Sequence, residues 1–141
     1  MRPGVRGRQK PSSQAEQSYA ADVALAARRA ELLGAAGEAE SQFRDAQARR
    51  APDPELRRLA LELDSALTAA MHAAFAAQRA EIGPYGYDDR IYRRKARAKP
   101  RIHALTAEAE RLLTLRETHR LNDIPAVTFE PSPLMAPITK A

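Results

Sequence analysis

The chain has 141 residues, the length of one ordinary domain, and 44% of them are hydrophobic. It has no cysteine, which excludes a disulfide framework and thiolate metal sites, and its formal net charge is +5. No apolar run approaches the roughly 18 residues of a membrane span and the N-terminus lacks a secretory signal, so we expect a soluble intracellular protein.

The first segment, residues 1–12, is predicted to be a basic arm. It carries four basic groups and no acidic group, and its prolines and glycines cannot bury apolar surface. Ser13, with Glu16 three residues later, predicts a capping box that opens a helix.

The first predicted helix covers about residues 14–49. Apolar residues spaced by seven mark one face of it: Leu25, Leu32, Ala39 and Ala46, with Ala36 and Phe43 beside them. Gly34 and Gly37 each disfavour a helix interior by about 1 kcal/mol, so they could kink the helix, end it, or admit another backbone.

The second predicted helix covers residues 54–82. Asp53 can cap it, Pro54 suits its first position, and Gly83 with Pro84 ends it. Residues at three-four spacing predict a buried stripe: Leu56, Ala60, Leu63, Leu67, Ala70, Met71 and Ala74, widened by Ala66, Ala73, Ala77 and Ala80. The short connection at residues 51–53 predicts a long antiparallel hairpin with the first helix.

A third helix is predicted over about residues 100–121, after a loop at residues 83–99. Its apolar face comprises Ile102, Leu105, Ala109, Leu112 and Leu113, and Asn122 is its expected stop. The predicted class is therefore all-α: a long antiparallel hairpin plus a third helix, forming a helical domain over residues 13–123.

The last segment, residues 124–141, is predicted to be an extended arm. Its four prolines exclude a helix and a sheet interior, yet it is too apolar for a typical disordered tail. We expect it to lie in a groove, on its own body or on a neighbour's, through Val127, Phe129, Leu134, Met135 and Ile138. Because alanine dominates the apolar residues, the helical core should be thin and completed by other subunits.

The loop at residues 83–99 combines aromatic and basic side chains and is the main candidate contact surface. Its tyrosines, Tyr85, Tyr87 and Tyr92, can cover the end of the hairpin and contact a partner protein, or stack on exposed bases. The basic residues that follow can bind phosphates or an acidic protein face: Arg90, Arg93, Arg94, Lys95, Arg97, Lys99 and Arg101. We favour protein contact over nucleic acid because the total charge is modest and Asp88 and Asp89 oppose a phosphate surface.

No residue of the chain indicates catalysis. The three histidines, His72, His103 and His119, lack the spacing of metal ligands on one helix face, and each is typical of a helix surface or interface. Acidic pairs such as Glu62 with Asp64 point to different sides of a helix. We therefore expect no catalytic residue, metal or cofactor.

Three stretches, VRGRQKP, GPYGY and KPRIHALTAEAERLLTL, together resemble the layout of phage small terminase subunits over about half of the chain. The arms and hairpin also resemble phage head-to-tail adaptor proteins. The resemblance implies a non-catalytic subunit of a phage head, neck or packaging assembly, in the cytoplasm or the virion. It would bind other protein subunits as a homo-oligomer. The alternative is a DNA-binding module.

Overall fold

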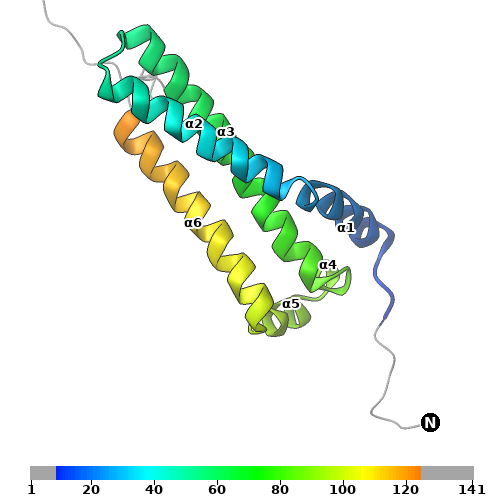
Figure 1. Ribbon diagram of the computed structural model, residues 1–141. Helices are drawn as coiled ribbons and strands as arrows, with labels where there is room; N and C mark the ends of the chain where they lie inside the picture. The colour runs from blue at the N-terminus through cyan, green and yellow to red at the C-terminus, as the bar shows by residue number, and fades with distance from the viewer. Residues whose placement is uncertain (1–8, 125–141) are drawn as a thin grey trace, which may run out of the picture.

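The computed structural model describes residues 9–124, and their regular structure is entirely helical. The elements are α1 (Ser13–Ala26), α2 (Arg29–Ala48), α3 (Asp53–Ile82), α4 (Tyr85–Asp88), α5 (Arg90–Ala96) and α6 (Pro100–Asp123). Figure 1 shows an elongated bundle in which α3 runs along most of the length, with α2 against its first half, α1 against its second half and α6 on the side away from α1. Within the described part, no helix is both long enough and apolar enough to cross a bilayer.

The main core lies where α2, α3 and α6 meet. Its largest members are Phe43, Leu59, Leu63, Leu67, Met71, Leu112 and Ile124, and alanines fill most of the remaining positions. A small second cluster of Ile82, Ala96 and Ile102 joins the ends of α3, α5 and α6. The stripe predicted on α3 therefore faces the interior. Its small side chains let α2 and α6 pack closely against it.

The first helix is divided, and the prediction of one helix over residues 14–49 was wrong. The break lies at Ala27 and Arg28, where the Arg28 amide donates to Leu25 and its backbone leaves the helical region (φ −93°, ψ 1°). Gly34 and Gly37, which could have kinked or ended the helix, lie inside an unbroken α2. The bend directs α1 across the second half of α3 and onto α4, so tertiary contacts locate it.

Both predicted caps near these helices are displaced by one residue. Ser12, not Ser13, caps α1: its hydroxyl accepts from the Ala15 amide at 3.0 Å. The helix α3 begins at Asp53, with Pro52 at the capping position. Between them, α2 ends with Arg50 in the left-handed conformation (φ 56°), and the Ala51 amide donates to the Ala46 carbonyl. This is a Schellman ending without glycine.

The segment at residues 83–99 is not a loop, contrary to the prediction. It holds the short helices α4 and α5, and Asp89 caps α5 by accepting from the Tyr92 amide at 2.9 Å. The last helix, α6, continues past the expected stop at Asn122 to Asp123. Leu113, predicted on its buried face, is 37% exposed.

Ile124, which was assigned to the C-terminal arm, is 1% exposed and belongs to the core. The rest of that arm and most of the N-terminal arm lie outside the described residues.

Candidate functional site

Tyr87 takes part in a polar network that fastens α1 to the body. The Arg79 guanidinium on α3 donates two hydrogen bonds to the Asp22 carboxylate on α1, at 2.8 and 3.1 Å, and the Tyr87 hydroxyl donates a third. Burial and the bond to Asp22 raise the pKa of Tyr87 well above its ordinary value, so the phenol stays protonated and donates. Three elements thus converge on one carboxylate.

The other tyrosines also make contacts within the chain. The Tyr19 ring on α1 packs edge-on against Tyr87, with centroids 6.4 Å apart. Tyr85 and Tyr92 pack on each other at 5.9 Å. All three predicted partner-binding tyrosines are therefore half-buried in contacts within the chain, and Tyr87 is the one that contacts α1. Partner contact through them stays a prediction.

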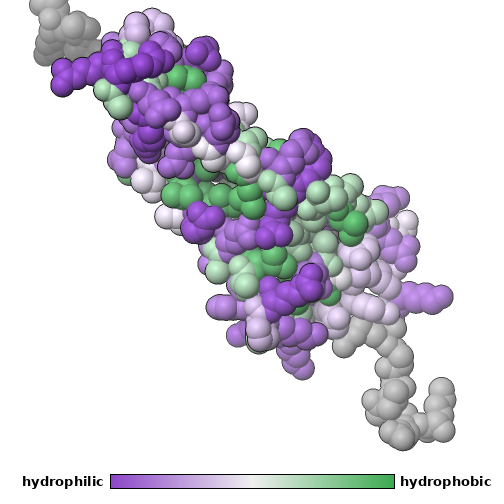
Figure 2. Space-filling view, viewed as in Figure 1, coloured by the Kyte–Doolittle hydropathy of each residue, from purple (hydrophilic) through white to green (hydrophobic). Residues whose placement is uncertain are grey.

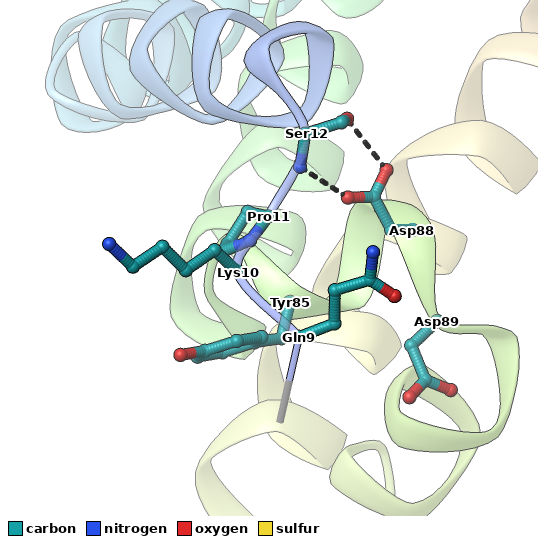
Figure 3. Close-up of a pocket in the computed structure, with 7 residues that line it drawn as sticks. All are labelled: Gln9, Lys10, Pro11, Ser12, Tyr85, Asp88 and Asp89. Carbon is teal, nitrogen blue, oxygen red and sulfur yellow. Dashed lines mark hydrogen bonds between the residues drawn. The ribbon is translucent and has the colours of Figure 1, made fainter. Parts of the chain in front are cut away.

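The start of α1 is tied to α4 by a second polar contact. The Ser12 amide and hydroxyl donate to the two oxygens of Asp88, at 2.7 and 2.9 Å. Figure 3 shows these bonds beside a cavity of about 410 Å³, where the Lys10 side chain extends away from Asp88 and Asp89. Asp88 thus holds the start of α1, and Asp89 caps α5.

The seven predicted basic residues divide into two groups. Arg93 is half-buried and donates to the Gly86 carbonyl at 2.8 Å, and Arg101 pairs with Glu81 at 2.8 Å. The other five are exposed and form no ion pair with any described residue: Arg90, Arg94, Lys95, Arg97 and Lys99. We call these five residues the basic face.

The basic face lies on the outer side of α5 and the turn that follows it. Tyr92 and Ala96 point to the bundle, while Arg90, Arg94 and Arg97 follow the four-three spacing of the opposite side. The nearby acids Asp88, Asp89 and Glu81 are held in contacts of their own. The face is therefore a local concentration of positive charge.

A groove of about 570 Å³ runs between α1, α3 and α6, because α6 packs on α3 without extensive contact with α1. Its apolar lining consists of Tyr19, Val23, Ala26, Ala77, Ala80, Ala104 and Leu105. We call it the α1–α3–α6 groove. In Figure 2, apolar side chains gather along the middle of this face, between more polar ends.

Ion pairs border the α1–α3–α6 groove. Arg29 on α2 donates two hydrogen bonds to Glu108 on α6, at 3.1 and 2.8 Å, and Arg101 pairs with Glu81 at the other end. The bond to Glu108 raises the pKa of Arg29, which keeps its charge at any ordinary pH. These pairs lie at the two ends of the groove and join α6 to α2 and to α3.

The sequence-based prediction missed this groove. Its signal was present in α1, where Tyr19, Val23 and Ala26 recur at four and three residues beside the heptad positions. That second stripe shows that α1 has apolar surface beyond what contact with α3 requires. Val23 is accordingly 44% exposed.

The histidines differ in placement. His72 and His103 are exposed, whereas His119 is buried, with Nε2 2.8 Å from the Ala60 carbonyl and Nδ1 2.8 Å from Asp123. Its ring also packs edge-on against Phe43. His119 thus holds the end of α6 against α2 and α3. Among residues 9–124, no three His, Asp or Glu side chains are grouped as metal ligands would be.

Five predicted partner-binding residues, Val127, Phe129, Leu134, Met135 and Ile138, lie outside the described residues. No protein-family model, curated protein sequence or solved structure matches this chain. The candidate sites therefore rest on the geometry given above: the α1–α3–α6 groove and the basic face.

Proposed function

We propose that the chain is a non-catalytic helical subunit that assembles with other copies of itself, and that the α1–α3–α6 groove is the contact surface. The observation that carries the proposal is the strip of α3 at Ala77 and Ala80, which α1 and α6 cover only partly. When another chain covers an alanine-rich groove of this kind, the burial of its apolar surface stabilises the assembly by roughly 25 cal/mol per Å².

The resemblance to small terminase subunits and head-to-tail adaptors favours a phage head, neck or packaging component within this class. Such subunits hold neighbours through extended ends. The long helices, the apolar segment at residues 125–141 and the groove together fit that role.

Two alanines on α6 offer a matched test of the groove. Ala104 lines it, whereas Ala107, one turn away and equally exposed, does not. Ala104→Glu should place a charge in the apolar groove and shift the assembled protein toward monomer in size-exclusion chromatography with light scattering. Ala107→Glu should leave the distribution unchanged. Identical behaviour of the two variants would remove the groove from the proposal.

A second function, nucleic-acid binding, is favoured by one specific observation. The five cations of the basic face have no ion pair within the described part of the chain, and a stripe such as Arg90, Arg94 and Arg97 spans roughly 10 Å. The tyrosines that would stack on bases are half-buried in contacts with α1 and with each other. Binding would therefore use phosphates only and read no sequence.

This second function predicts a defined salt dependence. Five phosphate contacts on duplex DNA give a slope of about −4.5 in log affinity against log salt, and the triple variant Arg94→Gln, Lys95→Gln, Arg97→Gln should reduce it to about −2. The control Arg50→Gln, Arg57→Gln, Arg111→Gln removes the same charge from exposed residues elsewhere. Equal weakening by both triple variants, or no binding at about 50 mM salt, would exclude it.

A further inference from the structure

The α1–α3–α6 groove offers few hydrogen-bond partners to the backbone of an extended chain. All three helices that form it satisfy their own backbone hydrogen bonds. Its lining combines apolar side chains, such as Ala77 and Leu105, with two carboxylates, Glu81 and Glu108, each already paired with an arginine. An incoming backbone would find few acceptors for its amide groups there, and each unpaired buried amide costs about 1–3 kcal/mol. The groove therefore selects a segment that is apolar and poor in N–H donors.

One segment of this chain has that chemistry. Residues 125–141 carry five large apolar side chains and only two charged ones, and four of their seventeen residues are prolines without an N–H. Prolines also restrict the free chain to extended conformations, which lowers the entropy lost on docking. Residues 1–8, by contrast, contain three arginines and only Met1 and Val5 as large apolar residues.

We propose that the α1–α3–α6 groove receives residues 125–141 of a second copy of this chain. The inference deepens the proposed function, on which it rests, by naming the occupant of the contact surface.

The position at which the described chain ends favours a second copy over the same one. Ile124 is buried with the core at the far end of α6, roughly 24 Å of helix beyond Glu108. Between that end and the groove lies the bidentate Arg29–Glu108 pair, which joins α2 to α6. The other end, beside Tyr19, is bordered by the Glu81–Arg101 pair from α3 to α6, and no ion pair joins α1 to α6 within residues 9–124. A segment from outside enters there without displacing Arg29.

The length of residues 125–141 does not by itself exclude docking on the same chain, because seventeen extended residues reach up to roughly 56 Å. An experiment that separates the two copies is therefore required. The absence of cysteine from the chain makes cross-linking between single introduced cysteines specific.

The test mixes two full-length variants, Ala104→Cys and Leu134→Cys, and treats them with a short bismaleimide. Ala104 lines the groove, and the control variant Ala107→Cys lies on the same helix outside it. We expect a covalent heterodimer from Ala104→Cys with Leu134→Cys, at least fivefold more abundant than from the Ala107→Cys control. Equal yields from both mixtures would overturn the inference.

The double variant Ala104→Cys, Leu134→Cys completes the test. Predominantly intermolecular products support docking on a second copy, whereas a product that cross-links within one chain overturns it. Native mass spectrometry of the same samples distinguishes failure of the named occupant from failure of the proposed function. Oligomers without cross-linking at Ala104→Cys contradict only the named occupant, and a monomer contradicts the proposed function itself.

Discussion

At the residue scale, the position of α1 depends on Asp22. Burial alone would raise the pKa of this carboxyl, but the hydrogen bonds from Arg79 and Tyr87 outweigh it and lower the pKa below the usual value. A group with a lower pKa in the folded state stabilises the fold above its unfolded pKa and loses that contribution as pH falls through the folded pKa. The stability contributed by Asp22 is therefore complete at neutral pH and is lost in acid, below about pH 4.

Asp22→Asn should remove this part of the acid sensitivity. We expect the variant to be less stable than the native chain at pH 7 and the difference to shrink toward pH 3. Urea unfolding followed by circular dichroism at both pH values measures it. Glu40→Gln in the middle of α2, where the side chain is exposed, is the control and should change little. A difference that is constant with pH would contradict the role of the carboxylate charge.

These residue contacts were beyond prediction from the sequence because their partners are far apart in it. Asp22 and Tyr87 are separated by 65 residues, and His119 and the Ala60 carbonyl by 59. Periodicity reveals which side of a helix is buried, but it does not reveal which polar groups meet across helices. The sequence indicated that His119 lies either on a helix surface or at a helix interface. The packing of α6 shows that it lies at an interface.

At the element scale, the glycines of α2 give the clearest prediction. Gly37 is exposed within the helix, and a methyl group there would meet no atom within 4 Å. Gly37→Ala should therefore raise the free energy of unfolding by about 0.5–1 kcal/mol, measured by urea unfolding, because alanine loses less backbone entropy. Gly83→Ala should do the reverse, since Gly83 ends α3 at φ +97°. Lower stability in the Gly37 variant would show instead that another backbone approaches α2 here.

The long elements were predictable, and the short ones were not. The apolar stripe on α3 and the Gly83–Pro84 ending were sufficient to place a 30-residue helix within one residue of its observed bounds. The break at Ala27 and Arg28 has no glycine or proline signal in the sequence, and it lies where the chain turns so that α1 contacts α3 and α4. In residues 83–99, turn-forming and basic residues concealed α4 and α5, which pack on Ile82 and Ile102.

At the scale of the whole molecule, the fold is a helical bundle in which the α1–α3–α6 groove is left open. The all-helical class could be predicted from composition and periodicity. The α1–α3–α6 groove could not, because it depends on how far α1 bends away from α2. The apolar segment at residues 125–141 and the α1–α3–α6 groove are complementary in chemistry. We propose that this complementarity holds copies of the chain together.

Native mass spectrometry of the full chain, beside a variant that ends at Ile124, tests this claim most directly. Ending there keeps the buried Ile124 side chain, so circular dichroism should show nearly unchanged helix content. We predict that the full chain gives one closed oligomer and the shortened chain gives monomer. A full chain that is monomeric at micromolar concentration, or a shortened chain that forms the same oligomer, would contradict the account.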